Sequence, residues 1–236
     1  HPDGILVSFE KMAAIVEIDL ANHVAVVQPG VTLHQLDEAL RPHGLIYPVQ
    51  PGENSASLGG NVATNAGGMR AVRYGVTRDL VLGLEVVLAD GRVLDGLSSL
   101  RKDNTGYDLR DLFIGAEGTL GIITAASLKL YPQPRTIETA FVAVPGMQAA
   151  VDLLALLRAA TGDCVWARTI LKGTFMGAAL PLMSPQVRAG WHHAARGRHP
   201  HGHFLAALVD EHHRHVRHRA IGAQRGNELL ACGVAA

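Results

Sequence analysis

The chain has 236 residues, of which 48% are hydrophobic, so it is long enough for one large domain, or for a domain and part of a second, with a sizeable core. Lys plus Arg and Asp plus Glu number 21 each, and this lack of net charge argues against nucleic acid or an acidic membrane surface as a partner. The two cysteines have neither metal nor redox spacing, which fits a reducing compartment. No apolar run approaches the ~20 residues of a membrane span, and the N-terminus has no signal peptide pattern. Together these features predict a cytoplasmic protein.

Two short strands and a helix are predicted at the start of the chain. Ile15–Ile18 and His23–Gln28 are apolar, β-branched runs joined by a polar turn. Thr32 with Gln35 three residues later is a capping-box signature, and Gly44 supplies a C-terminal stop. The helix between them presents one apolar face, formed by Leu33, Leu36 and Leu40.

The first glycine segment, Gln50–Gly75, is a long run of glycine, hydroxyl and amide residues. We expect it to be a long loop without secondary structure whose backbone N–H groups and positive φ angles suit a flat, phosphate-bearing cofactor. It contains neither GxGxxG nor GxxxxGK[ST], which points away from NAD and ATP. A flexible linker is the alternative, but apolar residues are spaced among its glycines: Leu58, Val62 and Met69.

A hairpin and a second glycine-rich run follow. Leu80–Ala89 reads as a strand that turns at Asp90–Gly91. Arg101–Tyr107 is a polar loop, whose simplest interpretation is a solvated turn. The second glycine segment, Gly115–Gly121, leads into a strand over Leu120–Leu130 and indicates close approach of backbone to a flat group, with an ordinary turn as the alternative. The core candidates of this strand are Ile122, Ile123, Leu128 and Leu130.

Prolines 132 and 134 mark a boundary, after which a strand over Thr136–Val144 and a helix over Met147–Ala160 begin a new unit. Beyond about Val165 neither helical nor strand periodicity persists, because glycine, arginine and histidine dominate, and the sequence does not predict the structure of this segment. Nine of the 13 histidines lie between His192 and His218, yet nothing there predicts the fixed geometry of a built metal site.

Six pieces of the sequence carry a resemblance to a known family. The chain resembles the FAD-linked oxidoreductases of the vanillyl-alcohol oxidase / p-cresol methylhydroxylase superfamily, within the group of D-2-hydroxyglutarate dehydrogenase, D-lactate dehydrogenase and the glycolate oxidase D subunit. The resemblance covers about residues 5–160. Its pieces are VQPGV (27–31), SLGGNVATNAGGMR (57–70), RYG (73–75), LGLEVVLADGRVL (82–94), RKDNTGYDL (101–109) and FIGAEGTLGIIT (113–124).

The resemblance implies an α+β fold with a partial FAD-binding PCMH-type domain over residues 1–134, the start of a substrate-binding cap over 135–164, and a His/Arg-rich tail over 165–236. It implies FAD as the cofactor and hydride transfer from C2 of a D-2-hydroxy acid to flavin N5, giving the 2-oxo acid. An electron-transfer flavoprotein or a quinone is the implied electron acceptor. The implied cofactor-binding residues are Pro51, Gly52, Ser57, Gly59, Gly60, Asn61, Thr64, Asn65, Gly67, Gly68, Glu117, Gly118, Gly121, Ile122 and Ile123.

Two departures from the family are expected to matter for activity. Family members carry a further glycine-rich loop upstream of His1, and a cap with GDGN-type and EHG-type segments that do not appear here. Glu211–His212 is similar to the latter, but His213 replaces its glycine. No catalytic residue and no metal ligand is therefore assigned. The alternatives are an inactive fragment with weak or no flavin binding, or another flavin oxidase of the same fold, such as an aldonolactone oxidase.

Overall fold

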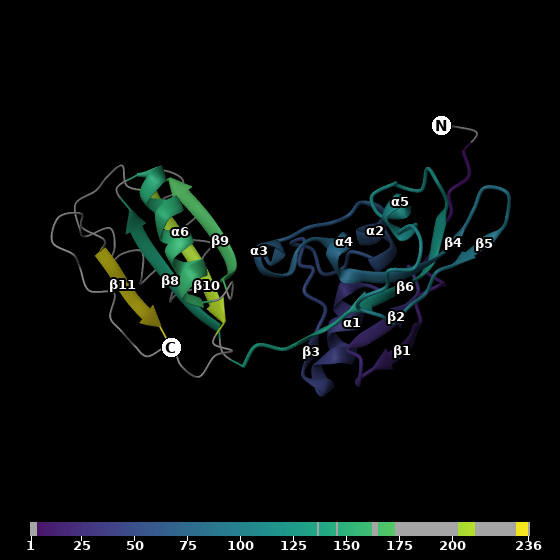
Figure 1. Cartoon of the computed structure of the whole chain (residues 1–236), viewed down its shortest axis with the longest axis horizontal. Helices are drawn as coiled ribbons and strands as arrows, with labels where there is room; N and C mark the ends of the chain where they lie inside the picture. Colours follow the sequence, from purple (N-terminus) through teal and green to yellow (C-terminus); the bar gives the residue numbers. More distant parts are fainter. Residues whose placement is uncertain are drawn as a thin grey trace. The chain divides into compact units, whose positions relative to one another are not determined.

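The computed structural model describes residues 4–135, 137–144, 146–161, 165–172, 203–210 and 230–235. The chain divides into two compact units, His1–Gln133 and Pro134–Ala236, coloured purple to teal and teal to yellow in Figure 1. The break lies between the two prolines at which the sequence predicts a boundary. The assignment of these parts to a flavin domain, a cap and a tail stays a prediction.

The first unit is built on a five-stranded antiparallel sheet in the order β1-β2-β6-β4-β5. Its strands are β1 (Ile15–Asp19), β2 (Val24–Val27), β4 (Val81–Val87), β5 (Val93–Asp95) and β6 (Ile122–Lys129). The expected strands are thus confirmed, and so are the two tight turns. Asp19 closes the first turn by accepting hydrogen bonds from the backbone N–H groups of Ala21 and Asn22, and Gly91 takes a φ of 84° in the second.

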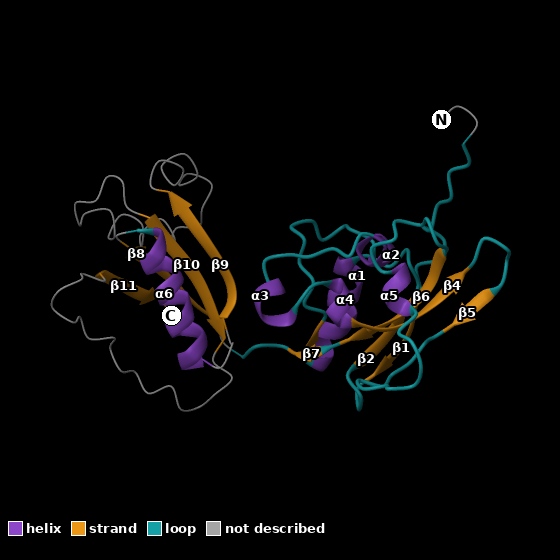
Figure 2. Ribbon diagram, turned by 45° about the horizontal axis from the view of Figure 1, so that its top comes forward, coloured by secondary structure: helices purple, strands orange, loops and turns teal. Residues whose placement is uncertain are grey.

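Helix α1 (Leu33–Leu40) follows its sequence signal closely. The Thr32 side chain accepts from the Gln35 N–H, the Gln35 side chain accepts from the Thr32 N–H, and the expected apolar face is buried. A 3-10 turn, Arg41–His43, then ends at Gly44 with a left-handed φ of 64°. Strand β3 (Leu45–Ile46) pairs with β7 (Tyr131–Pro132) beside it. Figure 2 shows that the helices of this unit gather on one side of its sheet.

The expectation that the first glycine segment is a loop without secondary structure is wrong. It contains α2 (Leu58–Ala63) and α3 (Ala71–Tyr74), and α4 (Thr77–Leu80) follows directly. The reason is local: Ser57 caps the start of α2, and both Leu58 and Val62 are fully buried. Six residues that include two glycines form a helix because packing outweighs their low propensity. A further short helix, α5 (Arg110–Phe113), precedes the second glycine segment.

The core of the first unit lies between this sheet and its helices. Three of the four residues expected to be buried in β6 and just beyond it are buried: Ile123, Leu128 and Leu130. The fourth is not, since Ile122 is 41% exposed. Ile122 is the first residue of its strand, and there alternation puts it on the face opposite Ile123.

The second unit has a four-stranded antiparallel sheet in the order β11-β8-β10-β9. Its strands are β8 (Ile137–Val144), β9 (Val165–Lys172), β10 (His203–Asp210) and β11 (Leu230–Ala235). Helix α6 (Met147–Thr161) packs on this sheet and buries Ala150 and Leu153. The strand expected over Thr136–Val144 and the helix expected over Met147–Ala160 are confirmed by β8 and α6.

After Val165, where no sustained periodicity is seen in the sequence, the structure has β9, β10 and β11. β9 (VWARTILK) and β10 (HFLAALVD) are rich in apolar residues, but these do not alternate strictly with polar ones, and long stretches rich in His, Arg and Gly separate the strands, so the isolated sequence gives a weak signal. These strands are stabilised by pairing with one another, which a local pattern does not show: β10 pairs with β8 along all eight of its residues. The histidines around this strand, from His192 to His201 and from His212 to His218, lie outside the described residues.

Candidate functional site

The two glycine segments lie side by side and are joined by backbone hydrogen bonds. The Gly115 N–H donates to Val62 O at 3.1 Å, and the Glu117 N–H donates to Ala63 O at 2.9 Å. Both acceptors are carbonyls at the C-terminal end of α2, which have no partner inside the helix. The two segments are therefore adjacent, as common contact with one cofactor requires, and α2 is the element that brings them together.

The other end of α2 is fixed by the protein itself. The N–H groups of Leu58 and Gly59 donate to Val31 O at 2.7 Å and to Pro29 O at 2.9 Å, and the Gly60 N–H donates to Ser57 Oγ at 3.3 Å. These first-turn amides, which the sequence suggested as ligand donors, already have acceptors. The start of α2 therefore serves to hold the segment in place.

Several glycines are needed for packing rather than for access. A Cβ at Gly59 would collide with Pro29, and one at Gly68 would collide with the Gln50 carbonyl. Gly118 differs, because a Cβ there would have no atom within 4 Å. Gly118 also has a φ of 78°, which a side chain adopts at a cost. Backbone at Gly118 is thus open for a flat group to approach.

Some donors in the two segments do remain available. Within the described residues, the backbone N–H groups of Gly67, Gly68 and Gly118 have no acceptor. The side-chain Nδ2 of Asn61, which is buried in α2, also lacks a partner there. A buried amide donor without an acceptor is uncommon in proteins, and a ligand with several oxygen acceptors would satisfy such groups. The donor set therefore fits a group like the pyrophosphate and carbonyl oxygens of FAD.

The expected cofactor-binding residues differ in their exposure. Those with exposed backbone or side chain are Pro51, Gly52, Gly60, Thr64, Gly68, Glu117, Gly118 and Ile122, and those half-buried are Ser57, Gly59, Asn65, Gly67 and Gly121. Asn61 and Ile123 are buried. The Ile123 side chain belongs to the core beneath β6, so only its backbone is available to a ligand.

Each segment also holds one non-glycine residue in the left-handed region. Asn65 has a φ of 49° and Glu117 a φ of 51°. Asparagine tolerates this conformation, and its Oδ1 here accepts from the Arg78 N–H at 2.9 Å. Glutamate does not favour it, so Glu117 stores backbone strain next to the open Gly118.

A small pocket of about 100 Å³ lies against the start of the first segment. Gln50 and Asn54 line it from that segment, and Arg70 lines it from just before α3. Partial burial lowers the pKa of the Arg70 guanidinium, while Tyr74 and Asp37 act in the other direction. Burial likewise raises the pKa of the Tyr47 phenol beyond its ordinary range, against a smaller opposing effect of Thr77.

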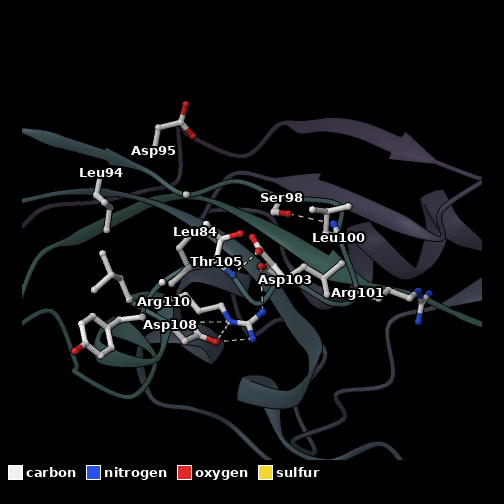
Figure 3. Close-up of a pocket in the computed structure, with 15 residues that line it drawn as sticks. Leu84, Leu94, Asp95, Ser98, Leu100, Arg101, Asp103, Thr105, Asp108 and Arg110 are labelled. Atoms are coloured by element: carbon white, nitrogen blue, oxygen red, sulfur yellow. Dashed lines mark hydrogen bonds and ion pairs between the residues drawn. The ribbon is translucent and has the colours of Figure 1, made fainter.

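A larger pocket, of about 310 Å³, lies between β4, β5 and the loop before α5 (Figure 3). The Arg101–Tyr107 loop that lines it is exposed throughout, as expected for a solvated turn. Arg110 fixes its end: the guanidinium holds Asp108 at 2.7 Å and donates to the carbonyls of Val81 and Leu82. None of the expected cofactor-binding residues lines this pocket.

Two site residues were missed in the sequence. Thr77 donates from both its N–H and its hydroxyl to Ala66 O, at 3.0 and 2.7 Å, and Arg78 bonds Asn65 of the first segment and Ile114, the residue before the second. Their signal was weak: a Thr-Arg-Asp triplet after Gly75 reads as an ordinary helix start. Neither residue type marks cofactor binding, and only the fold brings them to the joint.

The described part of the chain has neither a cluster of metal ligands nor a membrane-spanning helix. There, no group of three or more His, Cys, Asp and Glu side chains is arranged to hold a metal ion. Among the same residues, no helix has the length and apolar character needed to cross a membrane.

Comparison with known proteins identifies the first part of the chain. D-2-hydroxyglutarate dehydrogenase of Bos taurus is 48% identical over 162 residues, 68% of this chain and 30% of the bovine protein. D-lactate dehydrogenase of Archaeoglobus fulgidus is 46% identical over 150 residues, 64% of this chain and 34% of that protein. The chain thus spans about a third of the length of these curated relatives.

A solved structure of alkyldihydroxyacetonephosphate synthase has the same fold, with a TM-score of 0.72 over 85% of this chain and 37% of that one, at 21% identity. The family described as FAD binding domain matches residues 1–96. This match and the dehydrogenase relatives confirm the expected mixed helix and sheet fold, the flavin cofactor and the likeness to FAD-linked oxidoreductases. Residues 1–96 are therefore similar to the FAD binding domain family.

Proposed function

We propose that this chain is the flavin-binding part of an FAD-dependent dehydrogenase that oxidises a D-2-hydroxy acid, similar to D-2-hydroxyglutarate, to the 2-oxo acid. The observation that carries the proposal is the joint between the glycine segments, where Gly115 and Glu117 bond the end of α2. The curated relatives named for D-2-hydroxyglutarate and D-lactate support the substrate class.

The residues proposed to hold FAD are those expected from the sequence. The free N–H groups of Gly67, Gly68 and Gly118 would donate to its oxygens, together with the buried Asn61 amide. The open backbone at Gly118 would let its flat ring system lie close. When bound, FAD supplies the hydride acceptor for oxidation at C2 of the hydroxy acid, and the protein's part is to bind and orient.

The finer points of this proposal concern substrate, acceptor and location. The side chain of the hydroxy acid is proposed to be D-2-hydroxyglutarate-like, with the electrons passing to an electron-transfer flavoprotein or a quinone. A cytoplasmic location belongs to the same proposal. Each of these depends on protein regions beyond the joint of the two segments.

The test begins with FAD binding by the whole chain. We expect quenching of flavin fluorescence on titration, and a rise in melting temperature with added FAD, since saturation at 100 times Kd adds about 2.7 kcal/mol of stability. Unchanged fluorescence and melting temperature at millimolar FAD would contradict the proposal.

A second stage tests the reaction. D-2-hydroxyglutarate, D-lactate, glycolate and an aldonolactone are offered with an artificial dye acceptor, and L-2-hydroxyglutarate and L-lactate serve as controls. Dye reduction with a D-2-hydroxy acid supports the proposed substrate class. Reduction with an aldonolactone in its place would support the alternative of a sugar-type oxidase, and FAD binding without any reduction would support the alternative of an inactive flavin-binding fragment.

A further inference from the structure

Helix α4 is hydrogen-bonded to the middle of the first glycine segment, at Asn65 and Ala66. Thr77 donates two hydrogen bonds to Ala66 O, and the Arg78 N–H donates to Asn65 Oδ1 at 2.9 Å. These bonds hold Asn65 in its left-handed conformation, with a φ of 49°. The backbone of the first segment therefore leaves α2 in a direction set by α4.

The side chain of the same Arg78 reaches the start of the second segment. Its Nη1 donates to Asp111 O at 2.7 Å and lies 3.1 Å from Asp111 Oδ1, while its Nη2 donates to Ile114 O at 2.6 Å. Ile114 is buried, and its carbonyl immediately precedes Gly115. The guanidinium thus fixes the backbone at the residue directly before the second segment.

Arg78 and Asn65 lie at the joint itself. A Cβ at Gly115 would be 3.3 Å from Asn65 Cβ and 3.7 Å from Arg78 Nη2. The two direct bonds between the segments, from Gly115 and Glu117 to α2, lie within three residues of Ile114. One arginine therefore bonds Asn65 of the first segment and Ile114, the residue that directly precedes the second segment.

We propose that Arg78 is a positioning residue for the flavin site, which fixes the second glycine segment against the first through the carbonyls of Asp111 and Ile114. The proposal rests on the proposed function, because it assumes that both segments contact FAD. Arg78 acts through the backbone, since its guanidinium is bonded to the carbonyls of Asp111 and Ile114 and to the Asp111 carboxylate.

The chemistry of the side chain explains why arginine serves here. A guanidinium presents several donors in a rigid plane, so it bonds two carbonyls and one carboxylate at once. A lysine ammonium is a point charge on a flexible stem and would not hold both carbonyls in the same relative position. The interaction with Asp111 balances the charge of the half-buried Arg78.

Arg110 offers a matched control in the same chain. It too bonds two carbonyls, those of Val81 and Leu82, and one carboxylate, that of Asp108. The side-chain exposures are similar, 36% for Arg78 and 32% for Arg110. The Arg110 guanidinium, however, has its hydrogen bonds and its ion pair outside both glycine segments. Figure 3 shows its ion pair with Asp108.

The experiment compares Arg78→Gln, Arg78→Lys and Arg110→Gln in the full chain by FAD titration and by urea unfolding. We expect both glutamine variants to lose stability, but only the Arg78 variants to raise the Kd for FAD, by about tenfold or more, with Arg110→Gln within about twofold. We also expect a changed visible absorbance spectrum of bound flavin for Arg78→Gln alone. An equal change in Kd and spectrum for Arg78→Gln and Arg110→Gln would overturn the proposal.

Hydrogen exchange separates failure of this proposal from failure of the proposed function. In Arg78→Gln without FAD, we expect faster exchange of the Gly115 and Glu117 amides than in Arg110→Gln, because their bonds to α2 depend on the joint. If the unchanged chain binds no FAD, the proposed function fails while this exchange still tests the positioning. Equal exchange in the two variants would refute the role of Arg78.

Discussion

In the first glycine segment a Cβ at Gly59 or Gly68 would collide with the protein's own chain, whereas in the second a Cβ at Gly118 would meet no atom within 4 Å. The first segment packs tightly on Pro29 at Gly59 and on the Gln50 carbonyl at Gly68, although Gly52 near its start has no atom within 4 Å of a Cβ. In the second segment, Gly118 lies at a left-handed bend with open space before it.

The difference teaches that enrichment in glycine has two separate physical meanings. One is close packing of backbone on backbone, which contributes to stability and touches a ligand only indirectly. The other is open backbone, which contributes to access. Gly121 in the second segment belongs to the first kind, because its Cβ would lie 2.7 Å from Val86 Cγ1 and 2.9 Å from Val87 O. The kind of glycine is therefore a property of each position and not of a segment.

The largest expected effect comes from Gly68→Ala. The Cβ of the new alanine would overlap the Gln50 carbonyl, a backbone group that cannot rotate away as a side chain can. The backbone at residue 68 must therefore move away from the backbone at Gln50. We expect a loss of about 3 kcal/mol in the free energy of unfolding, at the upper end for overpacking. Urea unfolding followed by circular dichroism measures it. A loss below ~1 kcal/mol would mean that the packing role assigned to this glycine is wrong.

Gly118→Ala should separate stability from binding. At a φ of 78° the new side chain costs about 1 kcal/mol of stability. The methyl group would also enter the open space proposed for the cofactor. We expect it to weaken the binding free energy of FAD by ~1.4 kcal/mol, which corresponds to a tenfold rise in Kd. Flavin fluorescence titration measures the Kd, and urea unfolding measures the stability.

Gly91→Ala is the control for that substitution. Gly91 also has a left-handed φ, of 84°, and also has no atom within 4 Å of a Cβ, but it lies in the β4–β5 hairpin. We expect the same loss of about 1 kcal/mol and an unchanged Kd for FAD. Should both variants weaken FAD binding equally, the open backbone at Gly118 would have no special part in binding.

Ser57→Ala tests how far the joint depends on α2. Ser57 Oγ accepts from the Gly60 N–H at the start of the helix, and loss of such a cap costs about 1 kcal/mol. Ser55→Ala is the matched control, because Ser55 is exposed, and we expect it to stay within about 0.5 kcal/mol of the unchanged chain. Equal losses in the two variants would show that the cap does not hold the segment.

The sequence predicts the first unit well because its signals are local. The capping box of Thr32 and Gln35, the left-handed stop at Gly44 and the hairpin at Gly91 each depend on a few neighbouring residues, and each is present in the structure. Convergence of the two glycine segments was expected from resemblance. The bonds that achieve it, from Gly115 and Glu117 to α2, could not be derived from spacing, because 50 or more residues separate the partners.

Elsewhere the prediction failed where tertiary packing decides. A helix over Leu58–Ala63 contradicts the low propensity of its two glycines, and only burial of Leu58 and Val62 explains it. Arg78 gives no signal as a site residue, since its role arises from contacts to Asp111 and Ile114 across more than 30 residues of chain. Such contacts are consequences of the fold and cannot be seen in a local pattern.

The smallest effect concerns the two strained residues, one in each segment. Glu117→Gly keeps the backbone hydrogen bond to Ala63 O and removes the strain at a φ of 51°. Relief of this strain, ~1–2 kcal/mol, outweighs the conformational entropy that glycine loses on folding, so we expect the free energy of unfolding to rise by about 0.5 kcal/mol. Asn65→Gly instead loses the bond from the Arg78 N–H and should cost about 1 kcal/mol. Urea unfolding of both variants gives the signs. Changes of opposite sign in the free energy of unfolding would mean that Asn65 is stabilised by its bond from Arg78, whereas Glu117 is strained beside open backbone. Changes of equal sign would remove this distinction between the two segments.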